Sequence, residues 1–293
     1  MIDFNDNDLI IPTPRPGNAG DGTNANNEAF CLAFLGAAGG VGVSSLVIES
    51  AFSTLKRLRR KGDKTPRVCI IDLDFEHGAI ASYLDMEAGI SPDVLTGDGA
   101  RIDQSMTSAL VVKHASGLRL LAARNALSGN DIVNPACVLA LMDAASAMYD
   151  VVILDVPRIW RPWTHAALAA ADRAVMVTQL TIPALHGARI RMEELEERLA
   201  LARPMDVVLS KHERRSFRAT VSVRDAQAAL GRDITAFICV DGETPRDAMN
   251  CGEPSGNVHP SSRYVKDITA LTEQLLRCDE SEDKIIPRKQ AAS

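Results

Sequence analysis

Short apolar runs alternate with longer segments of helical periodicity along most of this chain, and no other feature restricts the possible folds as strongly. Because each run is apolar throughout, it is typical of a strand covered on both faces, as in parallel sheets. Strands that alternate with helices form βαβ units with right-handed crossovers. We therefore expect an α/β fold: a doubly wound, mostly parallel sheet with helices on both faces. The expected strands are 30–35, 68–72, 118–122, 151–155, 174–178, 207–210 and 234–240, and the expected helices are 45–58, 135–148, 164–170, 182–200, 223–230 and 264–278.

The two ends of the chain differ in composition from the part between them. Residues 1–28 are rich in Asn, Asp, Gly and Pro, and residues 279–293 are mostly polar. Such segments bury too little apolar surface to order themselves, so we expect a disordered leader and a flexible tail. Residues 29–278 hold every expected strand and helix. A chain of 293 residues with 46% hydrophobic residues can form one large α/β domain there.

Charge, hydropathy and cysteine usage exclude several classes of protein. The formal net charge of -6 gives no general electrostatic reason to bind nucleic acid or an anionic membrane. The first residues do not resemble a secretory signal, and no stretch reaches the roughly 18 apolar residues that span a bilayer. The six cysteines are widely scattered, which favours free thiols over disulfides or a zinc site. We expect a cytoplasmic protein without direct membrane insertion.

The sequence GAAGGVGVSS, residues 36–45, joins the first expected strand to the first expected helix. Backbone amides of such a loop and of the helix N-terminus point at an anion, whatever the side chains. A P-loop also needs a lysine before its hydroxyl residue, but here Val43 precedes Ser44. The alternatives are a tight glycine turn without a ligand and a dinucleotide site of the short-chain dehydrogenase type. The dehydrogenase alternative fails because the chain has no Tyr-x-x-x-Lys pair.

Carboxylates follow two of the expected strands. Asp72 and Asp74 end the segment VCIIDLD, and Asp155 ends YDVVILD. Polar groups at the carboxyl ends of parallel strands gather at one edge of the sheet, where such folds bind ligands. An apolar strand that ends in Asp is also typical of a Walker B carboxylate, which holds Mg²⁺. Together with the glycine loop, these residues favour a nucleotide site.

Several segments together resemble the MinD/ParA-type (SIMIBI) ATPase domain. More narrowly, they resemble its CpaE/TadZ branch, the pilus-assembly proteins of tight-adherence (Flp) secretion systems. The segments are GAAGGVGVSS, IIDLDFEHGAIASYLDMEAGISPDVL, GLRLLAA, YDVVILDVPRIWRPWTHAALAAADRAVMVTQLTIPAL and VSVRDAQAALG. The resemblance covers about residues 30–277, and its most specific part is 149–185, with Trp160 and Trp163. It implies a P-loop fold with ATP and Mg²⁺ as ligands.

The resemblance also implies a role for each matching position. The deviant Walker loop of this family, K-G-G-x-G-K-[ST]-[ST], falls on residues 38–45. By this resemblance Mg²⁺ would be held by Ser44, Asp72 and Asp155, and Asp74 would orient the attacking water. The residues expected to contact the nucleotide are Gly39, Gly40, Val41, Gly42, Val43, Ser44, Ser45 and, at the adenine, Ser210.

The chain departs from the family at both loop lysines, which are Ala38 and Val43 here. Phosphoryl transfer depends on neutralising the charge that spreads over the transferred group. Losing both cations should therefore slow hydrolysis by a factor on the order of 10³ or more. Nucleotide binding depends less on them, because the loop amides and the metal remain. We expect a degenerate ATPase with weakened binding of ATP and Mg²⁺ and little or no hydrolysis.

Two alternatives remain open. One is an active MinD/ParA-type ATPase, hydrolysing ATP to ADP, in which Arg158 or Arg161 replaces the missing lysine. The other is a ParA-like DNA-binding partition factor that uses the basic runs 55–64 and 211–218. The acidic chain does not favour DNA as a partner.

The expected partners are proteins. The first family lysine ties two subunits together across the nucleotides, and Ala38 lacks that charge. We therefore expect a homodimer that forms without nucleotide, with apolar residues such as Ala37, Ala38 and Val41, and Trp160 or Trp163, near the contact. As the resemblance implies, this dimer would bind pilus or secretion machinery proteins at the inner membrane or the cell pole.

Overall fold

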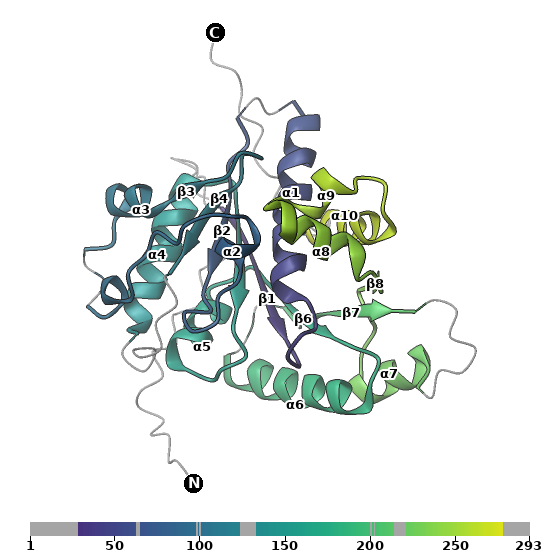
Figure 1. Cartoon of the computed structure of the whole chain (residues 1–293). Coiled ribbons are helices and arrows are strands. Elements are labelled where there is room, and N and C mark those ends of the chain that lie inside the picture. Colours follow the sequence, from purple (N-terminus) through teal and green to yellow (C-terminus); the bar gives the residue numbers. More distant parts are fainter. Residues whose placement is uncertain are drawn as a thin grey trace.

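The computed structural model describes residues 29–62, 65–97, 99, 101–123, 133–199, 201, 203–213 and 221–277. Within them an eight-stranded sheet has the order β3-β4-β2-β5-β1-β6-β7-β8 (Figure 1). Neighbouring strands pair in parallel, except that β3 runs antiparallel to β4. The predicted fold class, a doubly wound and mostly parallel α/β sheet, is confirmed. The strands are β1 (Phe30–Gly36), β2 (Val68–Asp72), β3 (Val112–Lys113), β4 (Arg119–Ala122), β5 (Val151–Val156), β6 (Arg173–Thr178), β7 (Asp206–His212) and β8 (Ala236–Cys239).

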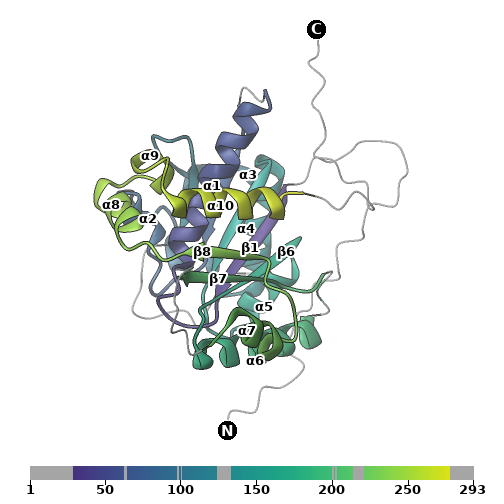
Figure 2. The same cartoon turned by 90° about the vertical axis from the view of Figure 1, so that its right-hand side faces the viewer.

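Helices cover both faces of this sheet (Figures 1 and 2). Apolar residues of α1, α2 and α10 pack on one face, and those of α4, α5, α6 and α7 pack on the other. The helices are α1 (Val43–Arg60), α2 (Ile80–Tyr83), α3 (Gln104–Leu110), α4 (Pro135–Met148), α5 (Pro162–Ala169), α6 (Ile182–Leu199), α7 (Val223–Leu230), α8 (Glu243–Cys251), α9 (Ser255–Val258) and α10 (Arg263–Leu275), with a 3₁₀ turn η2 (Pro92–Leu95). Of the helices in the described residues, none combines the length and apolar character needed to cross a bilayer.

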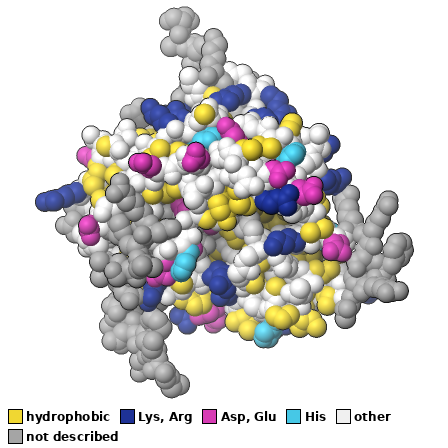
Figure 3. All heavy atoms as spheres, viewed as in Figure 1, with side chains coloured by type: hydrophobic (Ala, Val, Ile, Leu, Met, Phe, Trp, Pro, Cys, Tyr) yellow, Lys and Arg dark blue, Asp and Glu magenta, His cyan; other side chains and the backbone are white. Residues whose placement is uncertain are grey.

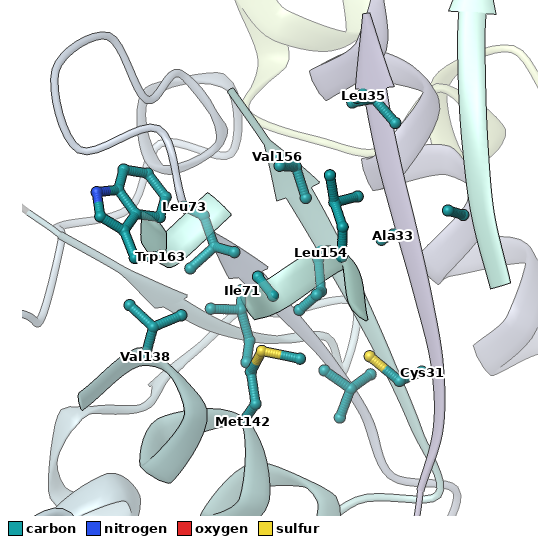
Figure 4. Close-up of a cluster of buried hydrophobic side chains, with 14 of the residues drawn as sticks. Cys31, Ala33, Leu35, Ile71, Leu73, Val138, Met142, Leu154, Val156 and Trp163 are labelled. Atoms are coloured by element: carbon teal, nitrogen blue, oxygen red, sulfur yellow. The ribbon is translucent and has the colours of Figure 1, made fainter. Parts of the chain in front are cut away.

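The central strand β1 is buried on both faces, as its continuous apolar sequence predicts. Leu32 and Phe34 belong to the cluster under α1 and α10. The alternate residues Cys31, Ala33 and Leu35 belong to the cluster under α4, α5 and α6. Figure 4 shows these three side chains together with those of neighbouring strands and of α4. Two apolar layers on one strand leave only its ends for polar groups.

Local signals determine where several helices begin. The side chain of Asn134 accepts a hydrogen bond from the N–H of Ala136, and Pro135 occupies the first helical position of α4. Ser222 and Asp225 form a reciprocal capping box at the start of α7. The predicted bounds of β2, α4 and α7 agree with the structure, and those of most other predicted elements differ by one or two residues.

Several short elements were not predicted: β3, α2, α3, α8 and α9. The two-residue strand β3 is too short to show a period of two, and α2 and α9 have four residues each. The predicted leader 1–28 and tail 279–293 lie outside the described residues.

Candidate phosphate loop and magnesium site

A tight glycine loop leaves the carboxyl end of β1 and leads into α1. The sheet continues as far as the N–H of Ala37, which donates to the carbonyl oxygen of Val177 on β6 at 2.8 Å. The chain then reverses through Gly40 and Gly42, whose φ angles are 71° and 89°. These left-handed conformations favour glycine because an L side chain would be strained there. The loop therefore depends on glycine at these two positions.

The amide groups of this loop are available to a ligand. Within the described part of the chain, the backbone N–H groups of residues 39–45 make no hydrogen bond to the protein. Gly42 is the N-cap residue of α1 and offers no side chain to cap its first turn. Free amides at the N-terminus of an 18-residue helix carry a partial positive charge. The geometry suits an anion such as a phosphate group.

The sheet register brings two of the predicted carboxylates together. Asp72 at the end of β2 pairs directly with Asp155 on β5. Both residues are buried, with 2% and 5% of their surface exposed. The hydroxyl group of Ser44, from the first turn of α1, donates a hydrogen bond to the carboxylate of Asp155. Three predicted metal ligands thus converge from three elements, although their role as ligands stays a prediction.

Burial raises the pKa of both carboxyl groups. Desolvation is the largest cause for Asp72, followed by the nearby charge of Asp155. Desolvation also dominates for Asp155, and the hydrogen bond from Ser44 opposes it. The N–H groups of Asp74 and Ile80 donate to Asp72 at 3.0 and 3.3 Å. Among the described residues no basic side chain compensates these two buried charges.

The oxygens at this site fit a magnesium ion. Mg²⁺ prefers hard oxygen ligands and is usually held by one or two carboxylates, with water and substrate phosphates completing its shell. Asp155, Asp72 and the hydroxyl group of Ser44 provide such oxygens beside the free loop amides. The described residues contain no group of three or more His, Cys, Asp or Glu side chains that would hold a metal unaided. A metal here would have water molecules or the phosphates of a nucleotide as further ligands.

Asp74, the predicted catalytic residue, has a local partner. Its carboxylate accepts a hydrogen bond from the N–H of His77 at 2.9 Å, which closes the turn after β2. Its charge also contributes to raising the pKa values of Asp72 and Asp155, so it lies in the same group. This position is compatible with orienting a water molecule, and that role stays a prediction.

Ser210, the residue expected at the adenine, is buried at the carboxyl end of β7. Its hydroxyl group donates to the carbonyl oxygen of Thr178 on β6, at 3.1 Å. The predicted contact with adenine would use the remaining lone pairs of this hydroxyl oxygen, and it stays a prediction.

Two cations approach the loop from other elements. The Nζ atom of Lys211 donates to the carbonyl oxygen of Gly40 at 2.7 Å. A Cβ atom placed on Gly39 would lie 3.6 Å from a terminal nitrogen of Arg158. The sequence suggested Arg158 as a substitute for the missing lysine, but it placed Lys211 only in a basic run. The one local signal for Lys211 was its position at the carboxyl end of a parallel strand.

The two tryptophans have different environments. Trp163 is 1% exposed and packs on Phe75, with ring centroids 4.9 Å apart. Trp160 is half-buried, and the guanidinium of Arg191 lies 5.4 Å from the centre of its ring. Trp163 is therefore a core residue that offers a second subunit almost no surface, and its place near a dimer contact stays a prediction.

Residues 55–60 of the basic run 55–64 form the last turns of α1, where cations complement the helix dipole, and residues 63–64 lie outside the described residues. Its Lys56 and Arg59 donate to the carbonyl oxygens of Gly256 and Ser116. Residues 214–218 of the second run lie outside the described residues. On the face shown in Figure 3, basic side chains intermingle with acidic ones. This mixed surface does not strengthen the DNA-binding alternative.

Gly78 is a constraint that the sequence did not reveal. A Cβ atom at this position would lie 2.5 Å from the carbonyl oxygen of Asp74 and 2.8 Å from Oδ2 of Asp72. Both distances are far shorter than a normal contact, so the carboxylate of Asp72 and the backbone of Asp74 keep their places because residue 78 has no side chain.

We expect Gly78→Ala to lower the free energy of unfolding by about 1–3 kcal/mol and to weaken magnesium-dependent nucleotide binding, because the added methyl group displaces Asp72. Urea denaturation and nucleotide titration measure the two effects. Gly97→Ala is the matched control, since a Cβ there meets no atom within 4 Å. Equal behaviour of the two variants would contradict the steric account.

Comparison with known proteins finds similarity in structure only. No protein-family model and no curated protein matches the sequence. A ParA family ATPase from Chlorobium tepidum TLS matches with a TM-score of 0.72 at 20% identity, over 85% of this chain and 99% of that one. MinD from Pyrococcus horikoshii OT3, complexed with Mg-ADP, matches with a TM-score of 0.69 at 17% identity, over 88% and 100%. A chain of the MinC:MinD cell division protein complex of Aquifex aeolicus matches with a TM-score of 0.68 at 20% identity, over 84% and 95%. The chain therefore has the α/β P-loop fold of the ParA and MinD ATPases.

Proposed function

We propose that this protein binds ATP and Mg²⁺ at the loop between β1 and α1. One observation carries the proposal: among the described residues, the free amides of a glycine loop lie beside a serine hydroxyl group and two buried carboxylates with no basic side chain to compensate their charge. A nucleotide with its metal ion would satisfy both sets of groups: its phosphates would accept from the loop amides, and its Mg²⁺ would bind the hydroxyl group and the carboxylates. The Pyrococcus MinD of the same fold was solved with Mg-ADP, which supports the choice of ligand.

Residues of this chain would divide the work between the metal and the phosphates. Magnesium, when bound, neutralises part of the phosphate charge. Ser44 and Asp155 would hold it, directly or through water, and Asp72 would complete the acidic side of the site. The amides of residues 39–45 would hold the phosphate oxygens. The helices on both faces of the sheet would exclude water from the site, except where it opens at the carboxyl ends of the strands.

We further propose that the protein hydrolyses ATP slowly or not at all. Ala38 and Val43 stand where the family has its two lysines, and neither carries a charge. Val43 instead packs against the apolar cluster under α1. The loop can therefore cradle phosphates with its backbone while lacking the side chains that stabilise charge during transfer.

The process we propose is assembly or localisation of a pilus, as in the CpaE/TadZ branch. The resemblance of residues 149–185 to that branch supports it, and so does a loop suited to binding more than to turnover. The partners would be pilus and secretion proteins at the inner membrane or the cell pole. In an organism with tight-adherence pili, deleting the gene should remove surface pili; normal piliation in electron micrographs would contradict the proposal.

Val43→Lys tests the nucleotide site directly. We expect it to tighten the affinity for ATP by about tenfold, because it returns a charge to a loop already shaped for phosphates. Isothermal titration calorimetry with ATP and Mg²⁺ compares the two proteins. Val43→Met, a long but uncharged side chain, controls for the added volume.

Two results would count against this reading of the site. Undetectable binding in both the wild type and Val43→Lys would mean that the loop is a structural turn. Magnesium-dependent turnover of the wild type near the ~10 s⁻¹ median of enzymes would mean that it is an active ATPase.

We also propose a homodimer that forms without nucleotide. Ala37 and Val41 are buried within the subunit, at 7% and 2% exposed, so their side chains offer a partner little surface. Ala38 and Trp160 are half-buried and are the stronger candidates for the contact. Analytical ultracentrifugation should show the same dimer with and without ATP and Mg²⁺. A monomer that dimerises only with ATP would contradict the proposal.

A further inference from the structure

The two cations beside the phosphate loop come from separate elements. Lys211 lies on β7, which is separated from β1 by β6, and Arg158 follows β5 on the other side of β1. The loop thus has one basic side chain on each flank, although it contains none itself. Both side chains are exposed, so a ligand can reach them.

The backbone at Lys211 is unusual. Its φ angle is 52°, in the left-handed region that few residues other than glycine adopt. The register explains this: Leu209 pairs with Phe237 and His212 with Cys239, so two residues of β7 stand opposite Ile238 alone. This is a β-bulge, a feature that commonly re-aims a side chain beside a binding site. Here the bulge accompanies a lysine that reaches the loop carbonyl of Gly40.

The position of Arg158 is supported by a second arginine. Arg191 of α6 donates from Nη1 to the carbonyl oxygen of Arg158 at 3.1 Å, while its guanidinium lies over Trp160. This contact fixes the backbone that carries Arg158 and adds a further positive charge nearby. Within the described residues, neither Arg158 nor Lys211 has an acidic partner.

We propose that Lys211 and Arg158, from outside the loop, contribute positive charge to the binding of the β- and γ-phosphates of a nucleoside triphosphate, to which Ala38 and Val43 contribute none. This inference rests on the proposed nucleotide site. An ammonium group has three donors, and Lys211 uses one of them for Gly40, which leaves two for phosphate oxygens. Charge-assisted hydrogen bonds to phosphate are among the stronger polar interactions.

A purely structural role for Lys211 makes different predictions. If Lys211 only holds the loop in shape through Gly40, its loss should weaken ATP and ADP equally. If it neutralises phosphate charge, its loss should weaken ATP more than ADP, and the difference should shrink as salt screens the interaction.

Lys211→Asn is the variant of choice, because Asn removes the charge and tolerates the left-handed backbone better than most residues. Arg158→Gln removes the second charge. Lys266→Gln is the matched control: Lys266 is exposed on α10 and forms no ion pair within the described residues. Fluorescence anisotropy with mant-ATP and mant-ADP in Mg²⁺, at low and high salt, gives the dissociation constants, and thermal unfolding verifies that each variant is folded.

We expect Lys211→Asn and Arg158→Gln each to raise the Kd for mant-ATP about tenfold or more, with a smaller rise for mant-ADP, and Lys266→Gln to leave both within twofold. An unchanged Kd in Lys211→Asn and Arg158→Gln, or equal losses for the two nucleotides, would overturn the inference while the proposed nucleotide site stands. No binding of mant-ATP by the folded wild type would instead refute the nucleotide site itself.

Discussion

The pairing of β1 with β5 on one side and β6 on the other is the constraint on which the rest of the site depends. In this register Phe34 pairs with Asp155, and Asp155 pairs in turn with Asp72 on β2. Three parallel strands therefore end at one level. Because helices cover both faces of the sheet, the backbone that leaves β1 can only turn above this edge, at the topological switch point where ligands bind in such folds. The left-handed glycines make that turn possible in the space available.

Features set by local sequence could be predicted well. The strand β2 ends at Asp72 because an unbroken apolar run stops there, and α4 begins at Pro135 because Asn134 caps it. The burial of β1 on both faces could be predicted because its sequence is apolar throughout and does not alternate with polar residues. In contrast, β3 is too short to leave a pattern, and its place at the edge depends on pairing with β4. The sequence shows that residue 163 is a tryptophan, but it does not show whether the side chain is buried. Only its packing on Phe75 in the folded chain identifies it as a core residue.

Some parts of the candidate site could likewise be predicted from the sequence, and others could not. Its loop, its serine and its three aspartates stand in the sequence at strand ends and helix starts, so their convergence could be expected from the fold class. The approach of Lys211 could not, because it depends on how neighbouring strands align and on a bulge that no local pattern marks. Arg158 was one of two arginines that the sequence suggested, and only the structure places its guanidinium beside Gly39. The need for glycine at position 78 was hidden for a similar reason: the atoms that exclude a side chain there include the carboxylate of Asp72, six residues away.

The hydrogen bond between Lys211 and Gly40 joins residues that are 171 positions apart in the chain. This separation has a consequence for the order of folding. The loop, Ser44 and both buried carboxylates all belong to the first 155 residues, yet the contact on Gly40 forms only after β7 has added to β6. Contacts of such long range form late, because the chain between them must be organised first. During synthesis on the ribosome, the loop residues would thus be made well before Lys211. The loop would reach its final shape only after β7 has been synthesised and has paired with β6.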